Sequence, residues 1–367
     1  MRWPIGLTNS DLNIIRLILL APIGAIYGAI ALLRRKLYNK RSIRFTPKET
    51  PIISIGNLAV GGTGKTPHTE FLIRMLQEKY RVATLSRGYK RATSGYILAD
   101  ATSTAAQIGD EPMQMHQKFP RVSVAVCEAR KEGIEQLQQL STPPQVILLD
   151  DAYQHLAVKA HLQVLLTDFA APYPTDFPLP AGNLREFSCA AHEADMVVVT
   201  KCPSTLSPKE AETIEKRLQL QPHHSCYFST LLYDSPHPLT EAAQQFSLNE
   251  KTHILLFTGI AHSEPLFQHL ASQYTDVKSI AFNDHHHYQD KEVDRICQII
   301  ALSNHQTALF TTEKDAARLY GTPLWKKLEG MPLFSVPISV KLLWNEQAFI
   351  QQIVSAIEKI REQRANC

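Results

Sequence analysis

A glycine-rich stretch near the start of the chain, NLAVGGTGKTPHTE (57–70), constrains the fold more than any other part of the sequence. It matches the phosphate-binding template G-x-x-x-x-G-K-[ST] except at Ala59, where the template has a glycine. The run PIISIG (51–56) before it predicts a strand, and apolar residues after it recur at helical spacing. A strand, a glycine-rich turn and a helix form the setting in which proteins bind phosphate groups.

This stretch therefore predicts a nucleotide site, with a plain glycine turn as the alternative. Backbone N–H groups of the turn are expected to surround phosphate oxygens, and the helix that begins at Lys65 directs its positive end at the anion. Lys65 is expected to reach the β- and γ-phosphates, and the hydroxyl of Thr66 to bind Mg²⁺. The residues predicted to bind ATP are Ala59, Val60, Gly61, Gly62, Thr63, Gly64, Lys65 and Thr66.

Two adjacent carboxylates supply the expected partner for the metal ion. The run VILLDD (146–151) has four apolar residues of a buried strand and then Asp150 and Asp151. In open α/β sheets, ligands bind at the carboxyl ends of the strands. We predict that Thr66, Asp150 and Asp151 hold Mg²⁺. A helix cap at Asp150 is the alternative interpretation.

The alternation of short apolar runs with helical stretches predicts an α/β fold with a mostly parallel sheet and flanking helices, similar to P-loop NTPases. Strands are expected at 51–56, 81–86, 122–126, 146–151, 164–168, 196–201, 253–259, 277–282 and 307–312, and a helix at 344–364. The stretch 226–250 breaks the alternation, and we place the domain junction there. We therefore predict three parts: a membrane-anchoring segment (1–45), a kinase core (46–235) and a smaller C-terminal α/β domain (236–367).

The N-terminal segment is apolar and then basic. Residues 14–33 carry one charge, Arg16, and at about 1.5 Å per residue they are just long enough to span a bilayer core. Residues 1–44 hold eight basic side chains and one acidic one, whereas the rest of the chain has a net charge of −4. This charge distribution favours an anionic membrane surface over nucleic acid. An in-plane helix, a spanning helix and a buried core helix all remain open.

Three further stretches combine polar residues in patterns that suggest a site. SRGYKR (86–91) follows a strand, IGDEP (108–112) reads as a helix start, and FNDHHHYQD (282–290) follows a strand in the second half of the chain. A solvated turn and a helix cap explain the first two equally well. Consecutive histidines point in different directions and rarely bind one metal ion, so a histidine that faces substrate is the favoured interpretation of the third.

Taken together and in this order, the motifs IGNLAVGGTGKTP, SRGYKR, GDEP, DDAYQH, LPAGNLRE, NDHHHY and TTEKD resemble those of the tetraacyldisaccharide 4′-kinases. The resemblance runs from the apolar N-terminus to about Asp315. It implies ATP- and Mg²⁺-dependent phosphorylation of the 4′-hydroxyl of a tetraacyldisaccharide 1-phosphate, a lipid A precursor. It also implies that the protein acts at the cytoplasmic face of the inner membrane of a Gram-negative bacterium. No obligate protein partner is expected.

The resemblance further implies roles for single residues. Asp110 in GDEP would be the catalytic base and His285 its partner, although the position within the run His285–His287 stays open. Substrate would be bound by Arg87, Tyr89, Gln154 and Arg185. The family lacks the first glycine of the template, as this chain does at Ala59. The chain departs from the family at Ala152, Leu156 and Phe187, and these departures concern substrate contacts.

A membrane-associated P-loop switch without a lipid acceptor is the main alternative. A GTPase of that kind needs a base-reading N-K-x-D motif, but the corresponding strand end reads Thr200-Lys201-Cys202-Pro203. A non-enzymatic membrane adaptor is a second alternative, and paired carboxylates beside a phosphate loop would have no role in it.

Overall fold

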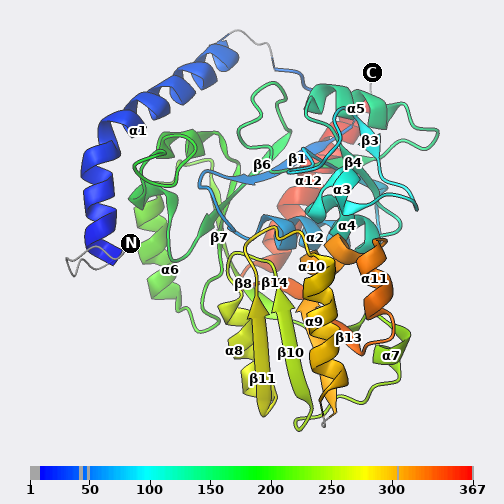
Figure 1. Cartoon of the computed structure of the whole chain (residues 1–367). Helices are drawn as coiled ribbons and strands as arrows, with labels where there is room; N and C mark the ends of the chain where they lie inside the picture. Colours follow the sequence, from blue (N-terminus) through cyan, green and yellow to red (C-terminus); the bar gives the residue numbers. More distant parts are fainter. Residues whose placement is uncertain (1–8, 41–43, 48–49, 304–305, 366–367) are drawn as a thin grey trace. The chain divides into compact units, whose positions relative to one another are not determined.

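The structure is a computed structural model that describes residues 9–365 except 41–43, 48–49 and 304–305. The chain divides into two compact units, neither of them continuous in sequence (Figure 1). Unit 1 comprises Met1–Ser86, Ala129–Leu231 and Val340–Cys367, and unit 2 comprises Arg87–Glu128 and Leu232–Ser339.

Unit 1 is built on a mostly parallel sheet in the order β14-β8-β7-β6-β1-β5-β2. Its elements are α1 (Asn9–Lys40), β1 (Ile52–Asn57), α2 (Lys65–Leu76), β2 (Val82–Ser86), α5 (Arg130–Gln138), β5 (Val146–Asp150), β6 (Leu162–Asp168), η1 (Tyr173–Thr175), η2 (Ser188–Glu193), β7 (Met196–Thr200), α6 (Pro208–Leu218), β8 (Ser225–Tyr233), β14 (Ile338–Leu342) and α12 (Glu346–Ala365). The chain passes between the units after Ser86, after Glu128, within β8 and within β14.

The strands of unit 1 are apolar on both faces because helices cover both faces of a parallel sheet. On β8, Phe228 packs with α6 in one cluster, whereas its neighbour Tyr227 meets the ring of Phe349 from α12, 5.0 Å between centroids. Neighbouring residues of a strand point to opposite faces. The two helices therefore lie on opposite sides of the sheet.

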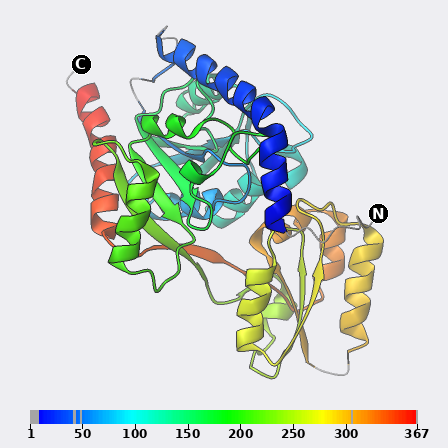
Figure 2. The same cartoon turned by 90° about the vertical axis from the view of Figure 1, so that its left-hand side faces the viewer.

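Unit 2 contains a second sheet in the order β11-β10-β12-β13-β9, parallel except for the β13–β9 pair. Its elements are β3 (Ile97–Leu98), α3 (Ala105–Ile108), α4 (Asp110–Lys118), β4 (Ser123–Val126), β9 (His237–Pro238), α7 (Glu241–Gln244), β10 (His253–Thr258), α8 (Glu264–Gln273), β11 (Asp276–Ala281), α9 (Asp290–Ala301), β12 (Thr307–Thr312), α10 (Glu313–Leu319), α11 (Pro323–Leu328) and β13 (Leu333–Val336). Helices α8 and α9 pack on opposite faces of this sheet (Figure 2).

The predicted α/β class, the parallel pairing and the strands from 51–56 to 307–312 are confirmed, with ends that shift by one or two residues. The stretch 226–250, where we placed the domain junction, begins within β8 and contains the change of unit after Leu231. Strand β8 pairs with β7 in register Val197↔Cys226.

The two units differ from the predicted division in two segments. Residues 87–128 group with unit 2 because α4 is tied to α10 by ion pairs, including Lys118–Glu313. Residues 340–367 group with unit 1 because α12 packs on its sheet, where Phe349 also meets Phe71 of α2. Both arrangements depend on contacts between distant parts of the chain, which a reading along the sequence does not reveal.

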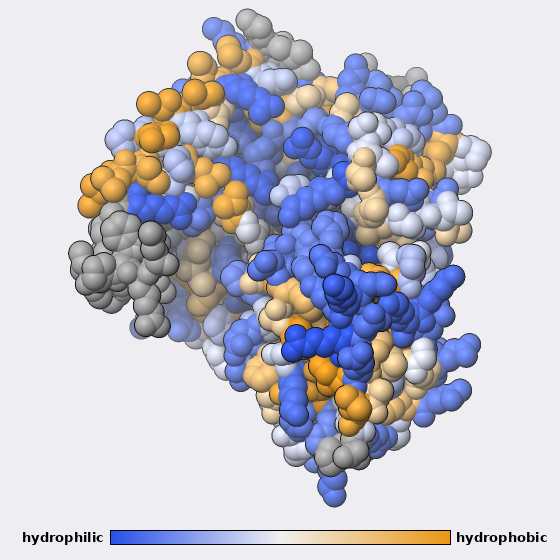
Figure 3. All heavy atoms as spheres, in the orientation of Figure 1, coloured by the Kyte–Doolittle hydropathy of each residue, from blue (hydrophilic) through white to orange (hydrophobic). Residues whose placement is uncertain are grey.

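One side of helix α1 packs against the rest of unit 1, and its other side is exposed. Gly24 and Gly28 allow close approach, because an added Cβ would lie 2.7 Å from the carbonyl oxygen of Pro178 and 2.6 Å from the ring of Phe187. Large apolar side chains at helical spacing are 42–70% exposed on its other faces: Leu17, Ile18, Leu19, Ile23, Ile26, Tyr27, Ile30, Leu33 and Leu37. Figure 3 shows this apolar surface along the helix. Residues 16–40 are long and apolar enough to cross a membrane, by length and composition.

Candidate active site

The glycine-rich loop lies between β1 and α2 and has the backbone of a phosphate-binding turn. Strand β1 is internal in the sheet, and α2 begins at Lys65 as predicted. Gly61 and Gly64 have φ values of 108° and 82°, which residues with a Cβ rarely adopt. The loop therefore depends on these two glycines.

The structure explains the missing glycine at Ala59. Ala59 forms an antiparallel bridge with Leu184, flanked by hydrogen bonds from Val60 N to Asn183 O (2.8 Å) and from Arg185 N to Leu58 O (2.7 Å). The first residue of the template is thus extended chain in this protein. An alanine is suited to that conformation, and the turn itself begins at Gly61.

Four of the predicted site residues meet at the carboxyl ends of β1 and β5. Lys65 Nζ lies 3.7 Å from Asp151 Oδ1. Arg185 Nη1 donates to both oxygens of Asp151, at 3.1 and 3.2 Å, and to Gln154 Oε1 at 3.1 Å. Gln154 in turn donates to the carbonyl of Asn57 at 2.7 Å. Two cations and a carboxylate therefore surround the point where the phosphate loop leaves its strand.

The two predicted metal-binding carboxylates have different surroundings. Asp150 is buried at the end of β5, and its Oδ1 accepts a hydrogen bond from Thr69 at 3.0 Å. The side chain of Asp151 is 34% exposed. Its backbone has a positive φ of 48°. Together with the Thr66 hydroxyl they are oxygen donors, the kind that Mg²⁺ prefers. Because Mg²⁺ usually takes one or two carboxylates and completes its shell with phosphate and water, this donor set fits the ion.

The sequence reasoning missed two residues that support the loop. His68 is buried, with Nδ1 2.7 Å from Gly64 O and Nε2 2.9 Å from Ser229 Oγ; burial lowers its pKa to about 4. It is therefore a neutral imidazole that ties the loop to β8. Asn57 is buried, and its Oδ1 accepts a hydrogen bond from Lys65 Nζ at 3.4 Å. The position of His68, in the first turn of the helix after the phosphate loop, could have identified it from the sequence.

A second group of predicted residues lies in unit 2. His285 Nδ1 is 2.9 Å from Asp110 Oδ2, and both side chains are largely buried. Asp110 is the first residue of α4, and the exposed ring of Tyr89 meets the His285 imidazole edge-on with 5.5 Å between centroids. Of the neighbouring histidines, His286 pairs with Glu292 at 2.8 Å and His287 is exposed. Arg87 is also exposed, in the same unit.

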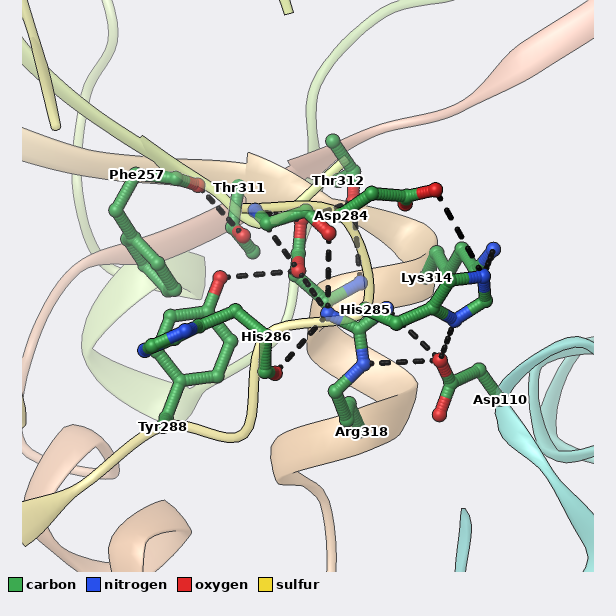
Figure 4. A network of polar contacts seen from close by, with 12 residues as sticks. Asp110, Phe257, Asp284, His285, His286, Tyr288, Thr311, Thr312, Lys314 and Arg318 are labelled. Atoms are coloured by element: carbon green, nitrogen blue, oxygen red, sulfur yellow. Dashed lines mark hydrogen bonds and ion pairs between the residues drawn. The ribbon is translucent and has the colours of Figure 1, made fainter. Parts of the chain in front are cut away.

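Asp110 is held by a network that the sequence reasoning did not identify (Figure 4). Arg318 on α10 donates to Asp110 Oδ2 through Nε (3.0 Å) and Nη2 (2.8 Å), and through Nη1 to Asp315 at 2.7 Å. Asp315 is fully buried and also accepts from Tyr288 Oη and from the Gly259 amide. Arg318 is therefore fixed on both sides, and with it the Asp110 carboxylate.

This network sets the charge of Asp110. Burial raises the pKa of its carboxyl, but the hydrogen bonds and charges of Arg318, His285 and Lys314 outweigh burial and hold the pKa below its usual value. The ionised Asp110 carboxylate accepts a hydrogen bond from Nδ1–H of His285, whose Nε2 lies 3.5 Å from the Lys314 ammonium.

Comparisons with known proteins identify the family. The sequence profile of the tetraacyldisaccharide-1-P 4′-kinase family matches residues 16–358. The chain belongs to this family. It is 43% identical over 354 residues to the tetraacyldisaccharide 4′-kinase of Bacteroides thetaiotaomicron, with 93% of each chain covered. It is 42% identical to that of Flavobacterium johnsoniae, with 95% of this chain and 99% of that one covered.

A solved relative supports the same assignment. The structure of LpxK from Aquifex aeolicus in complex with ATP superposes with a TM-score of 0.69 at 26% identity. The superposition covers 93% of this chain and 99% of that one. The family resemblance of the motifs is thereby confirmed, and a P-loop switch without a lipid acceptor is not favoured.

Proposed function

We propose that this tetraacyldisaccharide 4′-kinase family member transfers the γ-phosphoryl group of ATP to the 4′-hydroxyl of a tetraacyldisaccharide 1-phosphate. The products are the 4′-phosphorylated lipid and ADP. The observation that carries the proposal is the family match over residues 16–358, in a chain whose glycine-rich loop has the backbone of a phosphate site. ADP release that depends on the lipid acceptor tests it, because a switch hydrolyses nucleotide without that acceptor.

The phosphate loop and its neighbours would bind and stabilise the transferred group. Amide groups of residues 61–66 and the N-terminus of α2 attract phosphate oxygens. Lys65 and Arg185 are held by Asp151 in the structure, and on nucleotide binding they would supply positive charge to the γ-phosphate. Phosphoryl transfer depends mostly on this positioning and charge stabilisation.

Thr66, Asp150 and Asp151 are the residues that would hold Mg²⁺. The ion would neutralise phosphate charge and orient the β- and γ-phosphate oxygens. The buried Asp150, fixed by Thr69, would keep its orientation, whereas Asp151 would exchange contacts with the two cations beside it.

Asp110 and His285 are proposed as the acid–base pair. Oδ2 of Asp110 accepts from both His285 and Arg318, so Oδ1 is the oxygen that would accept the proton of the 4′-hydroxyl. A carboxylate with a depressed pKa is a weak base, but the loose transition state of phosphoryl transfer requires little base strength until late. His285 would orient the carboxylate and share the proton.

Helix α1 is proposed to lie in the plane of the cytoplasmic membrane surface. Arg16 donates to the carbonyls of Pro180 (2.9 Å) and Gly182 (2.8 Å), and Gly24 and Gly28 pack on the same loop. These contacts hold one side of the helix against a polar loop of unit 1, and this favours an in-plane helix over a spanning one. Its exposed apolar side would enter the lipid, and the basic residues at its end would meet anionic head groups.

Replacing exposed isoleucines of α1 tests the membrane proposal. The triple variant Ile23→Ser, Ile26→Ser, Ile30→Ser removes apolar area, and each buried isoleucine contributes about 1.5–3 kcal/mol. We expect its binding to vesicles with anionic lipid to fall at least about a hundredfold, with ATP affinity unchanged. Vesicle flotation measures this. Unchanged flotation would contradict the proposal.

The metal assignment predicts a loss at both carboxylates. Asp150→Ala and Asp151→Ala are each expected to lower kcat strongly, and to raise the Mg²⁺ concentration needed for half-maximal rate. A titration of rate against Mg²⁺ measures both effects, with Asp168→Ala as a control outside the predicted set. If both variants kept full activity at limiting Mg²⁺, the metal assignment would be wrong.

A further inference from the structure

One arginine of α1 has an environment that membrane binding does not require. Arg35 is 3% exposed, whereas its neighbours Arg34 and Lys36 are exposed. Its Nε and Nη2 donate to the two carboxylate oxygens of Glu186, at 2.7 and 2.8 Å. Nη2 also lies 3.3 Å from the carbonyl oxygen of Tyr153. This is a bidentate, buried ion pair between residues 151 positions apart in the chain.

A further carboxylate and an aromatic ring complete this environment. Arg35 Nη1 lies 2.9 Å from Oε2 of Glu193, and the guanidinium stands over the Tyr153 ring, 5.4 Å from its centroid. Glu193 also pairs with Arg44 at 2.9 Å. The guanidinium is therefore fixed on several sides. An arginine that only bound lipid head groups at the surface would not need these contacts.

Both segments that Arg35 binds carry residues of the candidate site. Glu186 follows Arg185, whose side chain binds Asp151 and whose amide donates to Leu58 at the entrance of the phosphate loop. Tyr153 lies between Asp151 and Gln154, and Arg185 contacts both of these. The guanidinium of Arg35 thus fixes the two backbones from which Arg185 and Asp151 reach each other.

We propose that Arg35 is a positioning residue for phosphoryl transfer, and that α1 is part of the active-site framework as well as a membrane helix. The inference rests on the proposed function. Arg35 acts through Glu186 and Tyr153 on the Arg185–Asp151 contact beside the phosphate loop. Loss of Arg35 leaves the buried Glu186 without its bidentate partner, which displaces the segment 183–186 and with it Arg185.

The test compares Arg35→Met with Arg34→Met, an adjacent exposed control. Both are assayed in detergent micelles, where lipid capture does not depend on membrane binding. We expect Arg35→Met to lower kcat about tenfold or more, and Arg34→Met to leave it unchanged. Arg35→Lys, which keeps the charge but cannot form the bidentate pair, should fall between them. Vesicle flotation should be unchanged in Arg35→Lys.

A second variant separates catalysis from folding. Arg35→Met combined with Glu186→Gln removes the unpaired buried charge, so its melting temperature should recover toward the wild-type value while kcat stays low. Recovery of kcat together with the melting temperature would overturn the inference and leave Arg35 a residue of stability alone.

A double-mutant cycle identifies the path of the effect. In an Arg185→Lys background, Arg35→Met should lower kcat much less than in the wild type, because the contact through which it acts is already disturbed. Equal effects in both backgrounds, or wild-type kcat in Arg185→Lys itself, would overturn the inference. A wild-type protein that transfers no phosphate to the lipid would instead defeat the proposed function, before any variant is compared.

Discussion

Lys65→Ala is expected to reduce phosphoryl transfer by about 10²–10³-fold or more, because it removes a cation from the charge that develops on the transferred group. The structure places this ammonium between Asn57 and Asp151, at the start of α2. Steady-state kcat with saturating ATP and lipid acceptor measures the loss. Wild-type turnover in this variant would show that the loop is not the ATP site.

The fold should survive this substitution. Asp151 keeps its contacts with Arg185 when Lys65 is lost, so no buried carboxylate is left unpaired. We expect a melting temperature close to that of the wild type. Lys79→Ala, at an ammonium that is 60% exposed, is the matched control and should retain full kcat.

Asp110→Ala is expected to lower kcat by about 10²–10⁴-fold, the usual contribution of general acid–base catalysis, with ATP affinity nearly unchanged. His285→Ala should lower it less, since it removes the partner and leaves the base. Asp294→Ala, at a carboxylate that is 50% exposed, serves as the control. Isothermal titration with ATP and steady-state kinetics measure the two quantities separately.

The double variant is the sharper test of this pair. Because His285 and Asp110 share one hydrogen bond, their combined loss should fall well short of the product of the single losses. Fully multiplicative losses would indicate that the two residues work independently. A large loss at His286 or His287 instead would place the functional histidine elsewhere in the run.

The sequence was sufficient for local structure that depends on neighbours along the chain. The phosphate loop needs a strand, glycines with positive φ and a helix in immediate succession, and all three can be read locally. The place of Asp150 and Asp151 at the carboxyl end of β5 follows from the same logic, and their role toward Mg²⁺ stays a prediction. Ala59 looked like a defect in the template only because its strand partner Leu184 is distant in sequence.

The interactions that the sequence did not predict join distant residues. Arg318 and Asp110 are 208 positions apart, and Arg35 and Glu186 are 151 apart. No periodicity marks an arginine as the partner of a given carboxylate, and a charge in or beside an apolar helix reads as a membrane-surface residue. The same reason explains why α12 and residues 87–128 could not be assigned to their units from the sequence.

The central claim is that this protein phosphorylates the 4′-hydroxyl of a lipid disaccharide. The most direct measurement is incubation of the full chain with ATP, Mg²⁺ and a tetraacyldisaccharide 1-phosphate, followed by mass spectrometry of the lipid. We expect one added phosphate, located at the 4′ position by fragmentation, formed together with an equal amount of ADP. ADP released without any phosphate on the lipid would contradict the claim.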